Sequence, residues 1–192
     1  MPFQSLREYL ESVAEYGDLL RIDGADREEE IGALAEIVSG TSKSPMILFD
    51  KIKGYPEGYR VSANTLGGIR RMALALGLNP DLNNVELVRA WKEKLKSFQP
   101  VHPREVKKGA VKENVFLKDE INLLKFPAPK WHELDGGYYL GTGCCVILRD
   151  PDEGWVNMGV YRIVVHDEKS LGIFINHIQQ ACEHIVSFIF RG

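Results

Sequence analysis

The stretch that decides the fold is Gly154-Trp-Val-Asn-Met-Gly-Val-Tyr-Arg-Ile-Val-Val-His166. It is rich in β-branched and aromatic residues, a composition typical of a β-strand. Two polar residues, Asn157 and Arg162, interrupt the apolar run. Side chains alternate between the faces of a strand, so residues five apart point to opposite faces unless a bulge intervenes. Gly159 lies between the two, and an interior glycine often marks a bulge or the close approach of a ligand.

A bulge at Gly159 would bring Asn157 and Arg162 to the same face. A carbonyl-type ligand and a guanidinium would then lie beside exposed backbone, a surface suited to a phosphate, a carboxylate or a metal ion. Spacing alone favours a simpler alternative, an edge strand with two solvated polar side chains. The residues of the strand leave both interpretations open.

Length and composition are those of an ordinary globular protein. A chain of 192 residues suits one large domain or two small ones with a sizeable core. The net charge of −3 gives no general affinity for nucleic acid or for a membrane surface. No apolar run is long enough to span a bilayer, and no secretory signal is visible. Three cysteines form no disulfide framework, so we expect a cytoplasmic protein.

Residues 1–99 alternate between helical and strand patterns, which predicts an α/β domain. A capping box at Ser5 and Glu8 predicts a first helix, and Asn84 is the expected cap of the last helix. Arg70 and Arg71 could bind an anion, but a solvated helix face is favoured. The other expected elements are a strand over 19–22, a helix after 26, strands over 45–49 and 59–63, and a helix over 67–76.

Residues 100–192 differ in character and are predicted to form a second domain. Two prolines punctuate a linker at its start, and a proline-stiffened loop covers 126–132. Strand patterns joined by short polar turns predict an antiparallel meander or barrel. These strands are expected over 138–148, 155–166 and 171–175, with a possible helix over 179–190. The predicted class is therefore α+β, an α/β domain followed by a β domain.

Common catalytic motifs are absent from the sequence. The histidines show no zinc-type spacing with cysteine, and there is no phosphate-binding loop or dinucleotide fingerprint. The cysteines lie in apolar runs and are expected to be packed small hydrophobes rather than nucleophiles. These are Cys144, Cys145 and Cys182.

A series of short motifs, taken together, resembles the UbiD-like decarboxylases. The resemblance covers about residues 100–177, and residues 1–99 are compatible with the leading α/β domain of that family. Any one motif alone would be weak, but all of them occur in the order of the family. The motifs are Phe126-Pro-Ala-Pro-Lys-Trp-His-Glu-Leu-Asp-Gly-Gly137, Thr142-Gly143, Arg149-Asp-Pro151, Trp155-Val-Asn-Met-Gly-Val-Tyr-Arg162 and Val165-His-Asp167.

The resemblance implies a carboxy-lyase that uses prenylated FMN. Such enzymes reversibly decarboxylate aromatic and α,β-unsaturated acids, so a small-molecule carboxylic acid is the expected substrate. A flavin prenyltransferase would supply the cofactor. Residues 100–192 would be part of a split β-barrel of the flavin-binding type. Exposed strand edges of a partial barrel favour a homo-oligomer.

The resemblance also assigns roles to individual residues. Asn157 would bind a divalent metal, typically Mn²⁺, that bridges to the flavin phosphate. The backbone of Met158 and Gly159 would lie near K⁺ and the cofactor. Arg162 would contact flavin and substrate and is the expected catalytic residue. An amide oxygen suits a hard cation, and an arginine fork matches a carboxylate.

The sequence departs from the family pattern after the third strand. Family members usually carry a Pro-Gly-Lys-His-Gly-Arg type segment there, whose histidine is a metal ligand. Gln179 and Gln180 occupy the Lys-His positions, so Gln179 is the expected cofactor contact and Gln180 the expected metal ligand. Cys182 replaces the arginine, and His184 matches a second histidine. His177 is an alternative ligand if the loop shifts.

The remaining metal-binding and acid–base glutamates of the family would lie beyond residue 192. The resemblance therefore covers the front of a longer enzyme, and the chain is expected to be a fragment or a short protein without its catalytic half. A second hypothesis is a non-catalytic flavin-binding or accessory subunit of a decarboxylase complex. A third is a purely structural domain that oligomerises through its strand edges.

Overall fold

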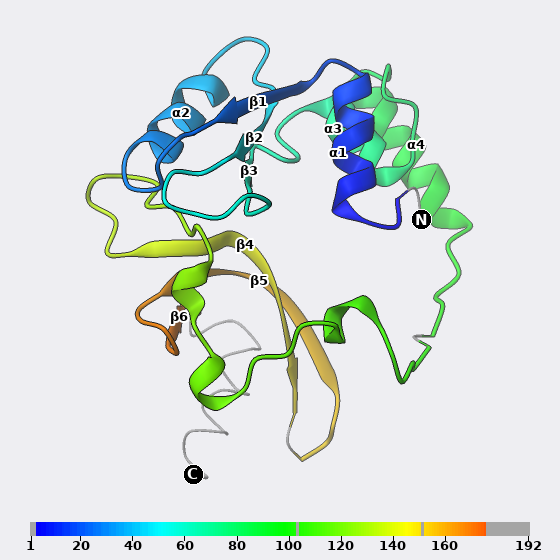
Figure 1. Cartoon of the computed structure of the whole chain (residues 1–192). Coiled ribbons are helices and arrows are strands. Elements are labelled where there is room, and N and C mark those ends of the chain that lie inside the picture. The colour runs from blue at the N-terminus through cyan, green and yellow to red at the C-terminus, as the bar shows by residue number, and fades with distance from the viewer. Residues whose placement is uncertain (1–2, 103, 151, 176–192) are drawn as a thin grey trace. The chain divides into compact units, whose positions relative to one another are not determined.

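The computed structural model describes residues 3–102, 104–150 and 152–175. It contains helices and strands in two compact units (Figure 1). The expected mixed α+β class is confirmed. Among the described residues, no helix has the length and hydropathy needed to cross a bilayer. The units are Met1–Ala25 with Ala33–Lys118, and Asp26–Gly32 with Asp119–Gly192. The domain boundary expected between residues 99 and 100 stays a prediction.

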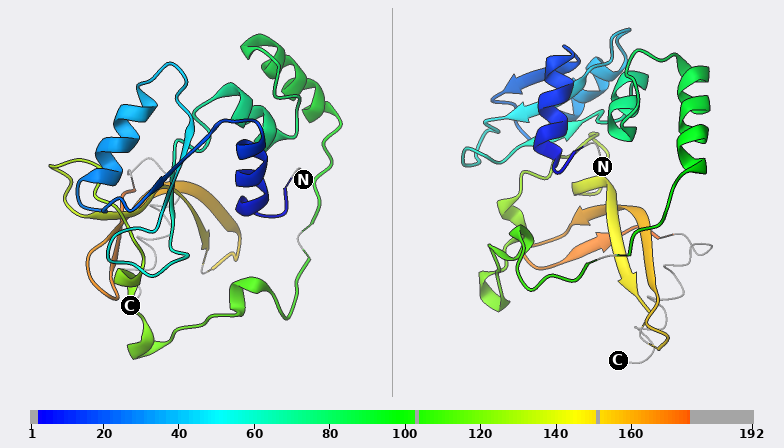
Figure 2. Two further views of the ribbon diagram at one scale, coloured as in Figure 1. Left: turned by 45° about the horizontal axis from the view of Figure 1, so that its top comes forward. Right: turned by 90° about the vertical axis from the view of Figure 1, so that its right-hand side faces the viewer.

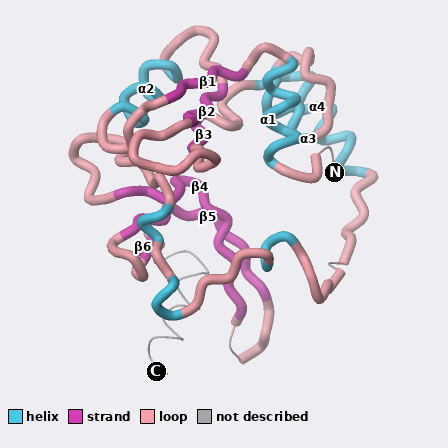
Figure 3. The backbone as a smooth tube through the Cα atoms, viewed as in Figure 1, coloured by secondary structure: helices cyan, strands magenta, loops and turns pink. Residues whose placement is uncertain are grey.

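The first unit contains a three-stranded sheet in the order β1-β2-β3 (Figure 3). The strands are β1 (Leu19–Asp23), β2 (Met46–Asp50) and β3 (Val61–Ala63), as the sequence predicted apart from end positions that differ by one or two residues. β1 runs parallel to β2, which requires a crossover, and α2 (Glu30–Ser39) lies in that connection. β3 is antiparallel to β2. All five residues of β2 are buried, as expected for the central strand.

Helices α1 (Leu6–Glu15) and α3 (Ile69–Leu76) lie side by side (Figure 2), and α4 (Asn84–Lys96) follows. The Ser5 side chain accepts the backbone N–H of Glu8, as the capping pattern predicted. The core joins α1, α3 and β2 through Tyr9, Leu10, Val13, Met46, Leu48 and Leu74.

Two details of the sequence prediction for these helices were wrong. The cap of α4 is Asn83 rather than Asn84, because Asn83 accepts two backbone N–H groups and Glu86 completes a capping box. Arg71 does not lie on a solvated face, since its side chain is 1% exposed. Consecutive residues of a helix point about 100° apart, so Arg70 reaches the surface while Arg71 points inward.

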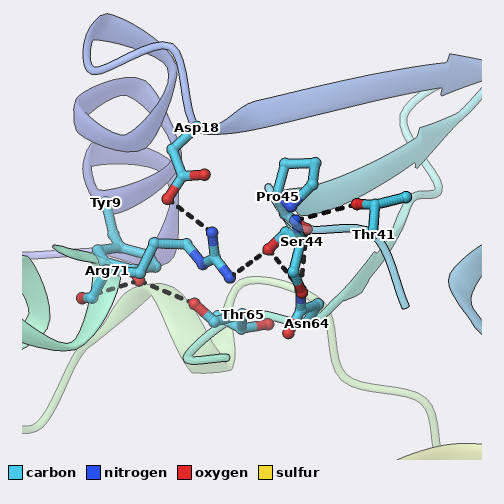
Figure 4. Close-up of polar contacts among 8 residues, drawn as sticks. All are labelled: Tyr9, Asp18, Thr41, Ser44, Pro45, Asn64, Thr65 and Arg71. Atoms are coloured by element: carbon cyan, nitrogen blue, oxygen red, sulfur yellow. Dashed lines mark hydrogen bonds and ion pairs between the residues drawn. The ribbon is translucent and has the colours of Figure 1, made fainter. Parts of the chain in front are cut away.

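Arg71 anchors the connections of the first unit (Figure 4). Its Nη1 donates to the Asp18 carboxylate at 2.6 Å, and its Nη2 donates to the Ser44 carbonyl oxygen at 2.8 Å. The side-chain amide of Asn64 donates to the carbonyl oxygens of Ser44 and Pro45. These bonds hold the turns before β2 and after β3, where Ser44 and Asn64 both have positive φ.

The second unit contains an antiparallel sheet in the order β4-β5-β6. Its strands are β4 (Tyr138–Arg149), β5 (Val156–Val165) and β6 (Leu171–Ile173), which confirms the predicted meander. The described strands do not show whether a barrel closes. Short 3₁₀ helices precede the sheet, namely η1 (Ala110–Lys112), η2 (Lys118–Glu120) and η3 (Leu123–Lys125). The helix predicted over 179–190 lies outside the described residues.

Residues 26–32 belong to the second unit through specific contacts. The Arg27 carbonyl oxygen accepts the N–H of Lys130 at 2.9 Å, and the Arg27 guanidinium lies 4.0 Å from the centre of the Tyr138 ring. The Tyr138 hydroxyl donates to the Glu28 carboxylate at 2.9 Å. Residues 26–32 therefore contact and position the start of β4.

Candidate functional site

The strand that the sequence singled out, β5, is the central strand of its sheet. It pairs with β4 on one side and with β6 on the other. The edge-strand interpretation was therefore wrong. Its register against β4 runs without interruption from Tyr161 opposite Cys144 to Val156 opposite Arg149.

The expected bulge at Gly159 was also wrong, because the irregularities lie in the partner strand. β4 shifts register on both sides of Gly141, while β5 stays regular. Asn157 and Arg162 are five residues apart on a regular strand, so they lie on opposite faces. The burial of β5 alternates accordingly, with Asn157 half-buried and its neighbour Met158 70% exposed.

Gly159 serves the packing of Tyr161 rather than a bulge. A Cβ at Gly159 would lie 2.7 Å from Cζ and 2.6 Å from the hydroxyl oxygen of Tyr161. The two residues share one face of β5, and Tyr161 is buried there at 7% exposure. Glycine is needed because any larger side chain would displace this ring.

Arg162 lies on the opposite face, at a pocket of about 300 Å³ lined by Tyr139, Arg162, Val164, Gly172, Ile173 and Phe174. Its guanidinium carbon is 5.1 Å from the centre of the Phe174 ring. Among the described residues, no carboxylate lies within 4 Å of this guanidinium. Among the described residues, Arg162 is therefore a cation without a carboxylate partner that lines a pocket.

The metal ligands expected from the sequence are not assembled by the described residues. Within ranges 3–102, 104–150 and 152–175, no group of three histidine, cysteine, aspartate or glutamate side chains could hold an ion. Asn157 stands apart from Arg162 on the other face of β5. Gln179 and Gln180 lie outside the described residues, as do His177 and His184.

Three aspartates of the motifs hold turns together. Each carboxylate accepts two backbone N–H groups, the usual way in which aspartate stabilises a turn. The pKa of Asp167 is lowered below that of an ordinary aspartate, chiefly because the Lys169 backbone N–H donates to it. The bonds are Asp135 with Trp131 and His132, Asp150 with Asp152 and Glu153, and Asp167 with Lys169 and Ser170.

The two described cysteines differ in burial. Cys144 is half-buried, and burial raises the pKa of its thiol, which makes it a poor nucleophile at neutral pH. Cys145 is exposed, so the expectation of a packed side chain was wrong there. Alternation along β4 places the two on opposite faces. Cys182 lies outside the described residues.

Comparison with known proteins identifies the family. The 3-octaprenyl-4-hydroxybenzoate carboxy-lyase N-terminal domain matches residues 10–91. The Rift-related domain of the same carboxy-lyase matches residues 104–191. The chain belongs to the UbiD family. The similarity inferred from the motifs is thus confirmed, and it extends into the first unit.

Individual UbiD relatives match almost the whole chain but less than half of their own length. Phenolic acid decarboxylase of Sedimentibacter hydroxybenzoicus is 36% identical over 184 residues, which are 89% of this chain and 36% of the relative. The closed-form structure of vanillic acid decarboxylase from the same organism has a TM-score of 0.87 at 31% identity. That match covers 96% of this chain and 40% of the solved one.

A third relative carries the cofactor. An evolved dimeric form of the UbiD-class enzyme HmfF from Pelotomaculum thermopropionicum was solved in complex with prFMN. It matches with a TM-score of 0.78 at 28% identity, over 96% of this chain and 41% of that structure. This chain therefore spans about two fifths of the solved decarboxylases that it resembles.

Sequence reasoning found Arg162 but missed its neighbours Phe174 and Tyr139. A signal was available, because three antiparallel strands with short turns bring residues after 171 back to the second half of β5. The register that sets Phe174 beside Arg162 depends on the turn over 167–170, which the sequence identified only as a turn.

Proposed function

We propose that this chain supplies the flavin-binding and carboxylate-binding half of a UbiD-type carboxy-lyase. Its reaction would be the reversible decarboxylation of an aromatic or α,β-unsaturated acid with prenylated FMN. Membership of the family and the decarboxylase names of its relatives support this proposal. The observation that carries it is the Arg162 guanidinium, which lines a pocket and has no carboxylate partner among the described residues.

Arg162 would bind and orient an anionic group. Its five donors lie in one plane and match the two oxygens of a carboxylate or phosphate. Tyr139 and Phe174 line the pocket beside this exposed guanidinium. The residues at this pocket therefore fit the carboxylate of a substrate or the phosphate of a flavin. The prenylated flavin, when bound, would supply an electron sink for the departing carboxylate carbon.

The proposed ion sites receive less support. Asn157 and Gln180 are the proposed Mn²⁺ ligands, and the backbone of Met158 and Gly159 is the proposed neighbour of K⁺. The described residues do not fit a complete metal site, because one amide on the far face of β5 from Arg162 is a single neutral ligand.

We also propose the domain arrangement, the cofactor contacts and the oligomeric state. The β4-β5-β6 sheet would be part of a split barrel, with a domain boundary near residue 99. Gln179 would contact the cofactor, and a flavin prenyltransferase would deliver it. A homo-oligomer would cover the strand edges, and a relative described as dimeric is compatible with this.

The test of this function is CO₂ release from a panel of phenolic acids by the complete enzyme that contains this half-site, after co-expression with a flavin prenyltransferase. Arg162→Ala is expected to reduce the rate by about 100-fold or more, because the carboxylate loses its orienting partner. Arg149→Ala is the matched control, since Arg149 is exposed and does not line the pocket.

Undiminished activity of Arg162→Ala would exclude the assigned role. Bound flavin without CO₂ release from any acid by that complete enzyme would instead support the second hypothesis, an accessory flavin-binding subunit.

A further inference from the structure

We propose that Phe174 is a positioning residue that holds the Arg162 guanidinium in its binding orientation. The inference rests on the proposed function only in treating Arg162 as the anion-binding residue of the pocket. It adds a second residue, on a different strand segment, that sets where the donors of Arg162 point.

The backbone fixes the two residues as cross-strand neighbours. Ile163 pairs with Ile173 in antiparallel register, which sets Phe174 opposite Arg162 on the same face of the sheet. The Phe174 N–H donates to the Arg162 carbonyl oxygen at 3.3 Å. Strand pairing therefore holds the backbone of Phe174 beside that of Arg162.

The ring makes a cation–π contact with the guanidinium. The distance of 5.1 Å from the guanidinium carbon to the ring centre lies within the range of about 6 Å for such contacts. An arginine side chain has many rotamers, and Arg162 has no carboxylate partner among the described residues to select one. A ring engages a guanidinium through its π-face, which leaves in-plane N–H donors available for an anion.

Core packing does not account for the position of Phe174. Its side chain is 64% exposed, although burial is the usual reason for a phenylalanine in a sheet. Its ring contacts Arg162, the charged side chain among the described residues that line the pocket. The position of the exposed Phe174 ring is explained if the ring orients the Arg162 guanidinium, which has no carboxylate partner among the described residues.

Gly172 lines the pocket, and a side chain at this position would clash with its neighbours. A Cβ there would lie 2.8 Å from Val164 Cγ1 and 2.5 Å from His166 Nε2. Tyr139 pairs with Val164 from the β4 side and also lines the pocket. None of the described residues that line the pocket carries a carboxylate that would compete with a bound anion for Arg162.

The test measures benzoate and benzamide binding to the 192-residue chain by NMR titration. The wild-type chain is expected to prefer benzoate. Phe174→Leu is expected to weaken benzoate binding about two- to fivefold, the usual size of an exposed cation–π contact, and to leave benzamide binding unchanged. Phe174→Tyr restores a ring and should restore the preference.

A double-mutant cycle identifies the mechanism. In an Arg162→Met background, Phe174→Leu should have no further effect on benzoate binding, because the ring acts only through the arginine. The Arg162 Hε resonance should carry a ring-current shift that disappears in Phe174→Leu and persists in Phe174→Tyr.

Three outcomes would overturn the inference: equal affinity of the wild-type chain for both ligands, unchanged benzoate affinity in Phe174→Leu, or an undiminished effect in the Arg162→Met background. A separate measurement, flavin retention, tests the proposed function. A chain that shows the expected coupling but never retains a flavin would refute the function and keep the inference.

Discussion

Arg71 carries a charged guanidinium into the interior of the first unit. Within the described chain, its Nε has no hydrogen-bond partner, while both terminal nitrogens are bonded. The Tyr9 hydroxyl lies within hydrogen-bonding distance of the carbonyl oxygens of Thr65, at 2.9 Å, and Arg71, at 3.2 Å. Burial raises the pKa of Tyr9, and the nearby Arg71 charge partly opposes this rise. This cluster connects α1 to α3 through polar contacts.

Arg71→Met is expected to destabilise the chain by about 3 kcal/mol, because the partly buried Asp18 carboxylate and the Ser44 carbonyl oxygen lose their partner. Arg70→Met is the matched control on the next residue of the same helix. Its carboxylate partner is 3.9 Å away and exposed, so a change below about 1 kcal/mol is expected. Urea denaturation followed by circular dichroism measures both, and equal effects of the two substitutions would refute the structural role of Arg71.

At the scale of single elements, β5 shows why a glycine was misinterpreted. A strand's own residues reveal its alternation, but its register depends on the partner strand. The irregular positions fall in β4 around Gly141, and nothing in the sequence of β5 marks them. Similarly, Asn83 and Asn84 both suit a helix cap, and only the position of Glu86 three residues after Asn83 distinguishes them.

Gly159→Ala is expected to destabilise the second unit by about 1–3 kcal/mol, because its Cβ would collide with the buried Tyr161 ring. Gly143→Ala on β4 is the control, since its Cβ would meet only Val160 Cγ1 at an ordinary 3.7 Å. Thermal unfolding of the two variants provides the comparison. If Gly159→Ala proved as stable as Gly143→Ala, the packing explanation for this glycine would be wrong.

For the whole molecule, the sequence predicted the family and most elements, because capping residues, turn residues and periodicity act locally. It did not predict the side-chain groups that join distant segments, such as Arg71 with Asp18 or Arg162 with Phe174. Those pairs depend on strand register and helix rotation. The motif aspartates illustrate the same limit, since the sequence identified the motifs and only the structure shows that they close turns.

The central claim is that this chain forms a competent half-site for prenylated FMN. The most direct measurement is the absorbance spectrum and the mass of any ligand released from the chain, after co-expression with a flavin prenyltransferase in the presence of manganese. A bound prenylated flavin is expected, and the Arg162→Ala variant should retain less of it than the Arg149→Ala variant. A chain purified without flavin under these conditions, or equal retention by both variants, would contradict the central claim.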